Sequence, residues 1–439
     1  MSPKVHVRAR EWEIRAPESE AGAALAGLRL SGAAERACAK RLSRAGMLHV
    51  RELAAGLEIE ATSYVGRIQL GDLTVTVVPK LRSDALFRLF RYAYGLRDIA
   101  LIGEARLSEE GPLFQEFLIA QLYAEARELY ARGLMRTYTG VSEDLSSPRG
   151  RIDVNRLARR VAPAETTLPC RHYLRMEDTL VNRVLLAGLR LGAAISEDRD
   201  RAAALSRVAD RLALTVSAVP LSTRLVARAK QSLDRLTKSY EAALALIGLL
   251  LDGTNPGLDP EEAIALPGFL FNMNHLFQRL VGRLLREGLT GWTVHEERAI
   301  KEMMRYAPGE NPRGRRHPRP RPDFMVTSAP RAKVLLDAKY RDLWQHELPR
   351  EMLYQLSMYA LSQPAGGRAI ILYPTIEKAA RPARIEFYEA TAGWDRASVV
   401  LQPLDLDELD ALVGAGEGRA REKGIGALAH KLVLGPPPW

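Results

Sequence analysis

The sequence predicts an α+β chain of several domains: a strand-rich N-terminal domain, a helical middle domain and a C-terminal α/β domain. Its 439 residues exceed what one hydrophobic core usually holds. Short alternating segments dominate the early part, helical periodicity fills the middle, and strands and helices alternate after it. We therefore expect domains at residues 1–160, 161–255 and 256–412, followed by a C-terminal tail at 413–439 that is poorly ordered from Gly414 until its last residues.

The N-terminal domain is predicted from three strands and the signals between them. Gly71-Asp72 is a good two-residue hairpin connection, and Pro79 ends the last strand because proline cannot donate to a ladder. A short helix and a longer one beginning after Pro112 follow. The expected elements are strands at Leu57–Ile59, Tyr64–Leu70 and Leu73–Val78 and a helix at Asp84–Tyr94.

The middle domain is helical between Asp178 and Asp252, where apolar residues recur at helical spacing. These stripes are most simply a helical core. A cluster of breakers at residues 252–260 marks the next domain boundary.

The C-terminal domain is predicted to alternate helices and strands around a basic, proline-rich loop at Pro308–Pro322. The expected helices are Gly268–Arg286 and Pro349–Ser362. The expected strands are Thr293–Glu297, Met303–Tyr306, Phe324–Thr327, Val334–Asp337, Ala369–Tyr373 and Arg384–Tyr388.

Composition narrows the class of protein. A hydrophobic fraction of 47% and a charged fraction of 26% are typical of globular proteins. No segment reaches the roughly 20 continuous apolar residues that span a bilayer, and the N-terminus has no apolar signal region. We expect a cytoplasmic protein without a membrane partner. Two cysteines, Cys38 and Cys170, cannot form a four-thiolate zinc or iron–sulfur site.

The net charge is +10, from 63 basic and 53 acidic residues. Such an excess favours polyanionic partners, nucleic acid above all, through counterion release. The alternative is that the positive charge has no function, and that a composition rich in arginine and alanine only reflects codon bias. No Gly-Lys dipeptide occurs in the sequence, which excludes a Walker A phosphate loop.

The candidate chemistry lies on two neighbouring strands. Asp323 enters one strand, and Asp337 and Lys339 close the next, with a turn around Ser328-Ala329-Pro330 between them. A hairpin of this kind can bring both aspartates to one end of the sheet. Residues two apart in a strand share a face, so Asp337 and Lys339 are expected to point into one cleft.

Two carboxylates beside a lysine suit phosphodiester hydrolysis. The carboxylates can hold Mg²⁺, with Mn²⁺ as a substitute, and the lysine can orient the attacking water or stabilise developing charge. The alternative is that Asp323 caps a turn while Asp337 and Lys339 form a surface ion pair.

This segment resembles the PD-(D/E)xK nuclease superfamily, whose domain has a mixed central sheet. On the expected helix after it, Gln355 and Tyr359 lie four residues apart and share a face. The stretch YQLSMY resembles the QxxxY element of the RecB-like branch. Any one of these signals is weak, but here they occur together and in order.

Four further stretches resemble the McrC family, the nuclease subunit of McrBC-type systems that restrict modified DNA. They occur in the right order, and with the nuclease motifs the resemblance extends over about Tyr64 to Tyr388, most of the chain. They are VGRIQLGDLTVTVVPKL at Val65–Leu81, SPRGRIDV at Ser147–Val154, CRHYLRMEDTLVNRVLLAGL at Cys170–Leu189 and LPGFLFNMNHLFQRLVGRLL at Leu266–Leu285.

The resemblance implies a metal-dependent endonuclease that cuts DNA when assembled with an AAA+ GTPase, McrB, and stimulates its hydrolysis. It also implies that the N-terminal domain docks onto that motor, with Lys80 and Arg82 as candidate contacts. One position departs from the family: Gln278 stands where a glutamate commonly contributes to the metal site. The site then holds metal more weakly, recruits Glu296 or Glu297, or is silenced.

Five arginines precede Asp323 and are candidate phosphate contacts: Arg313, Arg315, Arg316, Arg319 and Arg321. The prolines among them equally suit a solvated loop without DNA contacts. Two other readings of the whole chain remain. One is a regulatory subunit whose nuclease site is vestigial, and the other is a free-standing RecB-like repair exonuclease.

Overall fold

The computed structural model describes residues 5–96, 114–159, 166–254, 268–300, 303–328, 332–363, 367–388, 395–416 and 418–435. The chain forms two compact units. Unit 1 combines Met1–Asp98 with Asn272–Trp439, and unit 2 is Ile99–Phe271. This division differs from the expected boundary at residue 160, because the long helix after Pro112 packs with the helices of the middle segment.

The N-terminal part of unit 1 contains two sheets. Strands β1 and β6 pair in parallel, β5 pairs with β6 antiparallel, and β2, β4 and β3 form the second sheet. The three strands expected here are confirmed, and Gly71 between β5 and β6 has a φ of 61°. The elements are β1 (Val5–Arg10), β2 (Ile14–Arg15), η1 (Glu20–Leu25), α1 (Ala33–Arg44), β3 (Leu48–Leu53), β4 (Gly56–Ala61), β5 (Tyr64–Leu70), β6 (Leu73–Val78) and α2 (Ser83–Tyr94).

The C-terminal part of unit 1 is built on a six-stranded sheet of order β11-β12-β13-β14-β16-β15. The sheet is mixed, as expected: β14 lies parallel to β13 and β16, and the other pairs are antiparallel. Its strands are β11 (Thr293–Glu296), β12 (Phe324–Ser328), β13 (Ala332–Ala338), β14 (Gly367–Thr375), β15 (Ala383–Tyr388) and β16 (Asp395–Asp405).

The strand expected at Met303–Tyr306 is absent from the described residues of that segment. The backbone N–H of Tyr306 donates instead to His317 Nδ1 at 3.1 Å, and the two rings lie 5.8 Å apart between centroids. A side chain from the basic loop therefore takes the place of a ladder partner.

The helices of this part are α9 (Met273–Gly288), α10 (Arg350–Leu361), α11 (Leu406–Gly414) and α12 (Arg419–Leu434). The expected helix at Gly268 begins later, because Gly268–Asn272 is strand β10. Asn272 caps α9, accepting a hydrogen bond from the backbone N–H of Asn274 at 2.9 Å. The cap sets the first turn of the helix that carries Gln278.

The expected poorly ordered tail is also wrong, because α12 fills most of it. Ile425, Leu428, Ala429, Leu432 and Val433 are buried at helical spacing. A Cβ added to Gly288 on α9 would lie 2.5 Å from the Cβ of Ala429, so the two helices approach each other closely there.

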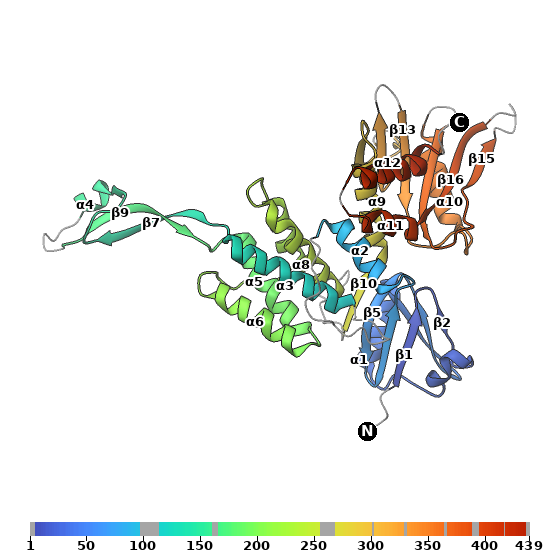
Figure 1. Cartoon of the computed structure of the whole chain (residues 1–439), viewed down its shortest axis with the longest axis horizontal. Coiled ribbons are helices and arrows are strands. Elements are labelled where there is room, and N and C mark those ends of the chain that lie inside the picture. The colour runs from blue at the N-terminus through green and yellow to red at the C-terminus, as the bar shows by residue number, and fades with distance from the viewer. Residues whose placement is uncertain are drawn as a thin grey trace. The chain divides into compact units, whose positions relative to one another are not determined.

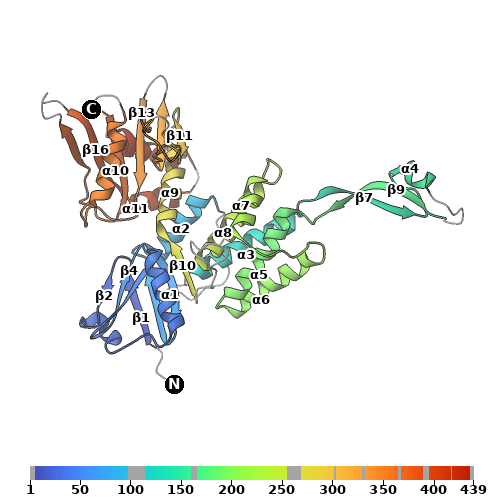
Figure 2. The same ribbon diagram turned by 180° about the vertical axis from the view of Figure 1, so that it is seen from behind.

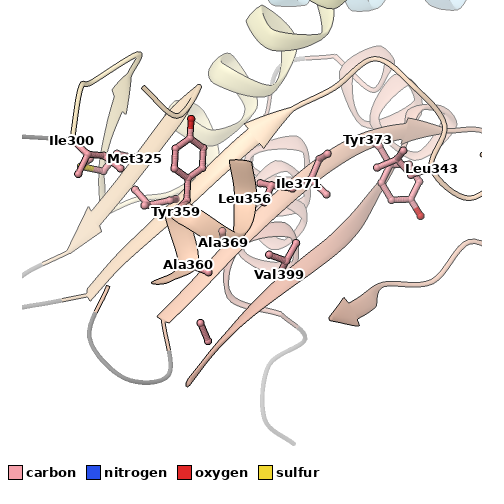
Figure 3. Close-up of a cluster of buried hydrophobic side chains, with 12 residues drawn as sticks. Ile300, Met325, Leu343, Leu356, Tyr359, Ala360, Ala369, Ile371, Tyr373 and Val399 are labelled. Carbon is pink, nitrogen blue, oxygen red and sulfur yellow. The ribbon is translucent and has the colours of Figure 1, made fainter. Parts of the chain in front are cut away.

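Helix α10 covers one face of the mixed sheet (Figure 3). Leu356, Tyr359 and Ala360 from the helix pack with side chains from the strands, among them Leu335 and Ile371. The Tyr359 hydroxyl points away from Ala360 and Ala369. The core of this part therefore fixes the helix while leaving one polar group at its edge.

Unit 2 is a group of helices with a long hairpin (Figures 1 and 2). Strand β7 follows the end of α3, and β9 leads into α5, so the hairpin inserts between two helices of the group. The helical middle segment is confirmed. The elements are α3 (Phe114–Arg132), β7 (Thr137–Leu145), β8 (Arg151–Ile152), α4 (Val154–Ala158), β9 (Leu168–Met176), α5 (Leu180–Ile195), α6 (Arg199–Ala213), α7 (Thr223–Gln231), η2 (Lys238–Tyr240) and α8 (Glu241–Thr254).

A buried amide organises the root of this hairpin. Asn182 donates to the carbonyl oxygens of Met135 and Glu177 and accepts from the hydroxyl of Tyr240 at 2.7 Å. Burying an amide is tolerated because its polar atoms are paired. The predicted boundary at residues 252–260 falls where α8 ends at Thr254, and its remainder lies outside the described residues. None of the described helices has the length and apolar character needed to cross a bilayer.

Candidate active site

Asp323 and Asp337 hold each other in place across the β12–β13 hairpin. Phe324 pairs with Leu336 in the antiparallel ladder, which sets the two aspartates opposite each other at its end. The backbone N–H of Asp323 donates to Asp337 Oδ1 at 3.2 Å, and the N–H of Ala338 donates to Asp323 Oδ2 at 2.8 Å. The predicted approach of the two carboxylates is therefore present.

Lys339 completes the group. Its Nζ lies 3.0 Å from Asp337 Oδ2 and 4.0 Å from Asp323 Oδ2. The Asp337 side chain is only 2% exposed, whereas those of Asp323 and Lys339 are 20% and 29% exposed. The sequence also allowed a simple surface ion pair between Asp337 and Lys339. The structure differs from that alternative, because the Asp337 carboxylate is buried and Asp323 also lies beside the lysine.

The electrostatics of the group reflect two acids in a small space. Burial, together with the neighbouring charge of Asp337, raises the pKa of Asp323 to about 6. Burial opposes the charge of Lys339, but Asp337 and Asp323 together raise the pKa of its ammonium group. The lysine is a cation at neutral pH and offsets part of the repulsion between the carboxylates.

Gln278 reaches the same place from α9. Its Nε2 donates to Asp323 Oδ1 at 3.3 Å. One turn further on, a Cβ added to Gly282 would lie 3.0 Å from the ring of Phe324, so a glycine is what lets α9 approach the sheet here. Gln278, the residue that departs from the family pattern, thus lies beside Asp323. A glutamate at this position would place its carboxylate next to that of Asp323.

The two glutamates suggested as substitutes differ. Glu296 is ion-paired with Arg286 on α9. Glu297 donates its backbone N–H to the carbonyl oxygen of Asp323 at 3.0 Å, and its charge contributes to the raised pKa of Asp323. Glu297 has a φ of 47°, unusual for a residue with a side chain. It is the better placed of the two to join the site.

Gln355 and Tyr359 share a face of α10, as predicted. Gln355 Nε2 donates to the Tyr359 hydroxyl oxygen at 2.8 Å. Burial and the nearby Asp337 and Asp323 raise the pKa of that hydroxyl, with Gln355 acting in the opposite direction. The phenol is therefore close enough to sense the carboxylates, and it stays protonated at neutral pH.

The five arginines before Asp323 are exposed. Their loop is held by hydrogen bonds: the side chain of Asn311 donates to the carbonyl oxygen of Arg315 and accepts from its N–H, at 2.8 and 2.9 Å. The backbone N–H of Ile300 donates to the carbonyl oxygen of Pro320 at 2.9 Å. The structure places the cations of Arg313, Arg315, Arg316, Arg319 and Arg321 in solvent on the chain that leads into the site.

Lys80 and Arg82 lie apart from this group, and both are exposed. Lys80 donates its backbone N–H to Glu11 Oε2 at 3.3 Å, and Arg82 lies 3.5 Å from Asp84. Glu11 in turn accepts from the hydroxyl of Tyr340, the residue after Lys339. The sequence did not predict the hydrogen bond between Glu11 and Tyr340. Only the position of Tyr340 next to Lys339 indicated that the tyrosine lies near the site.

The residues present fit a hard divalent cation. Two carboxylates converge, and burial together with the charge of Asp337 raises the pKa of Asp323. Among the described residues no group of three or more His, Cys, Asp or Glu is arranged to hold a metal ion. Two carboxylates are enough for Mg²⁺, which usually keeps several waters and takes its remaining ligands from substrate phosphates. The amide oxygen of Gln278 is a further candidate ligand.

Comparison with known proteins places the chain in a family. The family model described as McrBC 5-methylcytosine restriction system component matches residues 59–374, more than half of the chain. The chain belongs to this McrBC family. No curated protein matches the sequence.

Two solved structures resemble the McrBC family chain. One is a chain from a half-complex of the tetradecameric assembly of Thermococcus gammatolerans McrB AAA+ hexamers with bound McrC. It is 19% identical, covers 96% of this chain and 98% of that chain, and has a TM-score of 0.58, which shows the shared fold. The other belongs to the T. gammatolerans McrBC complex, with 18% identity, coverage of 65% and 88%, and a TM-score of 0.44.

Several motif residues that suggested the McrBC family have structural roles here. Asp178 forms two hydrogen bonds with Arg183, each 2.7 Å long, and Thr179 caps α5. Asp153 caps α4, accepting from the N–H of Arg156 at 3.1 Å. These residues shape the hairpin of unit 2 and take no part in the carboxylate group.

Proposed function

We propose that the chain is the nuclease subunit of a McrBC-type restriction system and hydrolyses DNA phosphodiester bonds with Mg²⁺ or Mn²⁺. One observation carries the proposal. The Asp337 carboxylate accepts a hydrogen bond from the backbone N–H of Asp323, and the Asp323 carboxylate accepts one from the N–H of Ala338. Lys339 lies within 4.0 Å of both carboxylates. A surface ion pair needs neither a second acid nor this mutual alignment.

In this proposal Asp323 and Asp337 hold the cation. When bound, the metal supplies a water of lowered pKa and neutralises charge on the phosphate. Asp337 is buried and fixed by the N–H of Asp323, so its carboxylate needs little reorganisation to bind. Asp323 is 20% exposed, so its carboxylate can be reached from solvent.

Lys339 serves a different step. Its ammonium group lies 3.0 Å from Asp337 Oδ2 and 4.0 Å from Asp323 Oδ2, so it would be beside a cation that these carboxylates held. It orients that water and stabilises the charge that develops on the phosphate. Tyr359, protonated and tied to Gln355, supports the cleft as a hydrogen-bond donor beside them.

The substrate side of the site is basic. Exposed arginines precede Asp323 in the chain, and guanidinium groups bind phosphate oxygens bidentately. These contacts position a duplex without reading its sequence. Because the family is described by 5-methylcytosine restriction, we propose modified DNA as the substrate, with recognition of the modification in a partner.

That partner is proposed to be an AAA+ GTPase. The matched chain of the T. gammatolerans assembly comes from McrB AAA+ hexamers with bound McrC. This chain has no Walker A loop of its own, so any nucleotide-driven movement along DNA has to come from another subunit. We propose that it binds such a motor, stimulates its hydrolysis and cuts only in the complex, with Lys80 and Arg82 as candidate contacts.

A second function is favoured by one observation. Gln278 places an amide where a carboxylate would complete a three-acid site, and it already bonds to Asp323. A site with one less negative charge binds a divalent cation more weakly. In that case the chain acts as a regulatory subunit that activates its motor without cutting.

The test compares Asp337→Ala, Lys339→Ala and the control Glu351→Gln, a change of an exposed acid at the start of α10. Each full chain is assembled with the motor, and DNA cleavage and nucleotide hydrolysis are measured together. We expect both site variants to lose cleavage, by at least about 100-fold, while hydrolysis and assembly match the control. Wild-type cleavage by Asp337→Ala would refute the nuclease assignment, and loss of assembly would point to a structural role.

A further inference from the structure

Unit 2 contains a groove between α3 and α6 that no part of the proposed nuclease uses. It is open to solvent and has a cavity volume of about 530 Å³. Tyr123, Arg127 and Tyr130 recur at helical spacing along α3, and Arg207 and Arg211 do so along α6. The remaining lining residues are small or apolar: Ala131, Ala204 and Val208.

The groove is strongly cationic. Its lining includes three arginines and, among the described residues, no carboxylate. No ion pair among the described residues joins Arg127, Arg207 or Arg211 to a carboxylate. Glu128, which follows Arg127, pairs with Arg132 at 2.6 Å. The three guanidinium groups of the groove therefore have free hydrogen-bonding capacity.

Aromatic rings lie beside these cations. The guanidinium of Arg127 sits 5.7 Å from the centroid of the Tyr123 ring. The Tyr130 side chain is 44% exposed, so its ring is open to solvent at the groove. A basic surface with interleaved aromatic rings is the feature by which proteins hold single-stranded nucleic acid, since the rings stack on bases of any sequence.

The floor of the groove is rigid. Leu122 and Ala126 on α3, and Leu205 and Ala209 on α6, are almost fully buried beneath it. A Cβ added to Gly192 on α5 would lie 3.0 Å from Leu205 and 3.8 Å from Leu122, so three helices meet closely there. The cations above are thus presented by a packed core.

We infer that this groove is a second DNA site, which binds the phosphates of a strand through Arg127, Arg207 and Arg211 and stacks an unpaired base on Tyr130. Arg207 and Arg211 lie four residues apart on α6, a rise of about 6 Å, and can contact successive phosphates. The charge of the groove alone would also suit an acidic protein surface, but the exposed ring favours nucleic acid. The site binds and does no chemistry, so it stands whether or not the chain hydrolyses DNA.

The test measures binding of the full chain to fluorescein-labelled single-stranded and duplex DNA of one sequence, by anisotropy, in a buffer with EDTA so that nothing is cut. The groove variant is Arg207→Ala with Arg211→Ala. Its control is Arg224→Ala with Arg228→Ala, two arginines that are also exposed, four residues apart, on α7 of the same unit. Both variants remove the same charge, and thermal unfolding confirms that both fold.

We expect the groove variant to bind at least about tenfold more weakly than the control. Its plot of log affinity against log salt should be less steep by about 1.4 for single strands and about 1.8 for duplex. Tyr130→Ala should weaken single-strand binding about tenfold, while Tyr130→Phe keeps it. Repeating the comparison with Arg315→Ala and Arg316→Ala removes the contribution of the basic loop near Asp323.

Equal affinities for the groove variant and the control would overturn the site. An unchanged affinity for Tyr130→Ala would overturn the stacking contact. If the groove variant kept its DNA affinity but lost binding to the nucleotide-hydrolysing partner, the groove would be a protein interface and the inference would be wrong.

Discussion

The hydroxyl of Tyr340 donates a hydrogen bond to Glu11 Oε2 at 3.0 Å, although the two residues are 329 positions apart in the chain. Both are buried, with exposed fractions of 6% and 2%. Tyr340 directly follows Lys339, and Glu11 follows the last residue of β1. The bond therefore ties the N-terminal sheet of unit 1 to the strand end that carries the candidate lysine.

The buried carboxyl of Glu11 makes stability depend on pH. Burial raises its pKa from 4.5 to about 7, against the opposing effect of Tyr340 and Lys80. Between these values the folded protein holds a proton that the unfolded chain releases, so this contribution to stability is lost as pH rises from 4.5 towards 7. Glu11→Gln is neutral throughout and keeps an acceptor for Tyr340. We expect it to gain about 3 kcal/mol relative to wild type across that window.

Denaturant unfolding at several pH values would measure this difference. Glu18→Gln is the control, since Glu18 is exposed on the same part of the chain. Parallel pH curves for Glu11→Gln and wild type would show that folding does not raise the pKa of Glu11.

Metal titration separates the role of Asp337 from that of Lys339. Calorimetry with Mg²⁺ or Mn²⁺ should show binding to the wild-type chain and none to Asp337→Ala. Lys339→Ala removes a cation that lies 3.0 Å from Asp337 Oδ2 and competes for its charge. We expect this variant to bind metal at least as tightly as wild type while losing cleavage. Loss of metal binding in Lys339→Ala would place the lysine among the groups that build the metal site.

Part of this site could be predicted because its determinants are local. Alternation in two short strands and a turn between them were enough to place Asp323 opposite Asp337, and helical spacing placed Gln355 next to Tyr359. The bond between Glu11 and Tyr340 could not be predicted, because nothing in either local sequence identifies a partner so far away along the chain.

The errors in the fold have physical causes too. Strand β10 at Gly268–Asn272 leads directly into α9, and its apolar residues are compatible with a strand or a helix. The helix starts only after Asn272, whose side chain caps it. The α12 segment contains Gly424 and Gly426, which lower helix propensity and suggested disorder. Packing against α9 and α11 overrides that preference.

Gln278→Glu tests the departure from the family pattern. The new carboxylate would replace an amide whose Nε2 lies 3.3 Å from Asp323 Oδ1, adding a third acid to two that already repel each other. Without metal we expect a lower melting temperature than wild type. With Mg²⁺ we expect the loss to be reversed and the metal affinity to rise about tenfold, because a third charge strengthens a divalent site.

Thermal unfolding with and without Mg²⁺ checks both parts, and His275→Glu, at an exposed position of α9, is a control for adding an acid to the same helix. A gain in cleavage with the gain in affinity would support a natural site that holds metal weakly. An unchanged metal affinity would show that Gln278 does not limit the site, and the regulatory reading would lose its basis.

The last helix should be part of the folded core of unit 1. Leu432 is 1% exposed and lies on the same face of α12 as Leu428 and Ala429, which packs against Gly288. Leu432→Ala should lower the free energy of unfolding by roughly 2–5 kcal/mol, because it leaves a cavity between helices. Lys431→Ala is the matched control: this neighbouring side chain is 54% exposed and pairs with Glu408 only at 3.5 Å. Its loss should cost no more than about 1 kcal/mol. Denaturant unfolding of the two variants measures the difference, and equal stabilities would mean that α12 does not pack on α9 in solution.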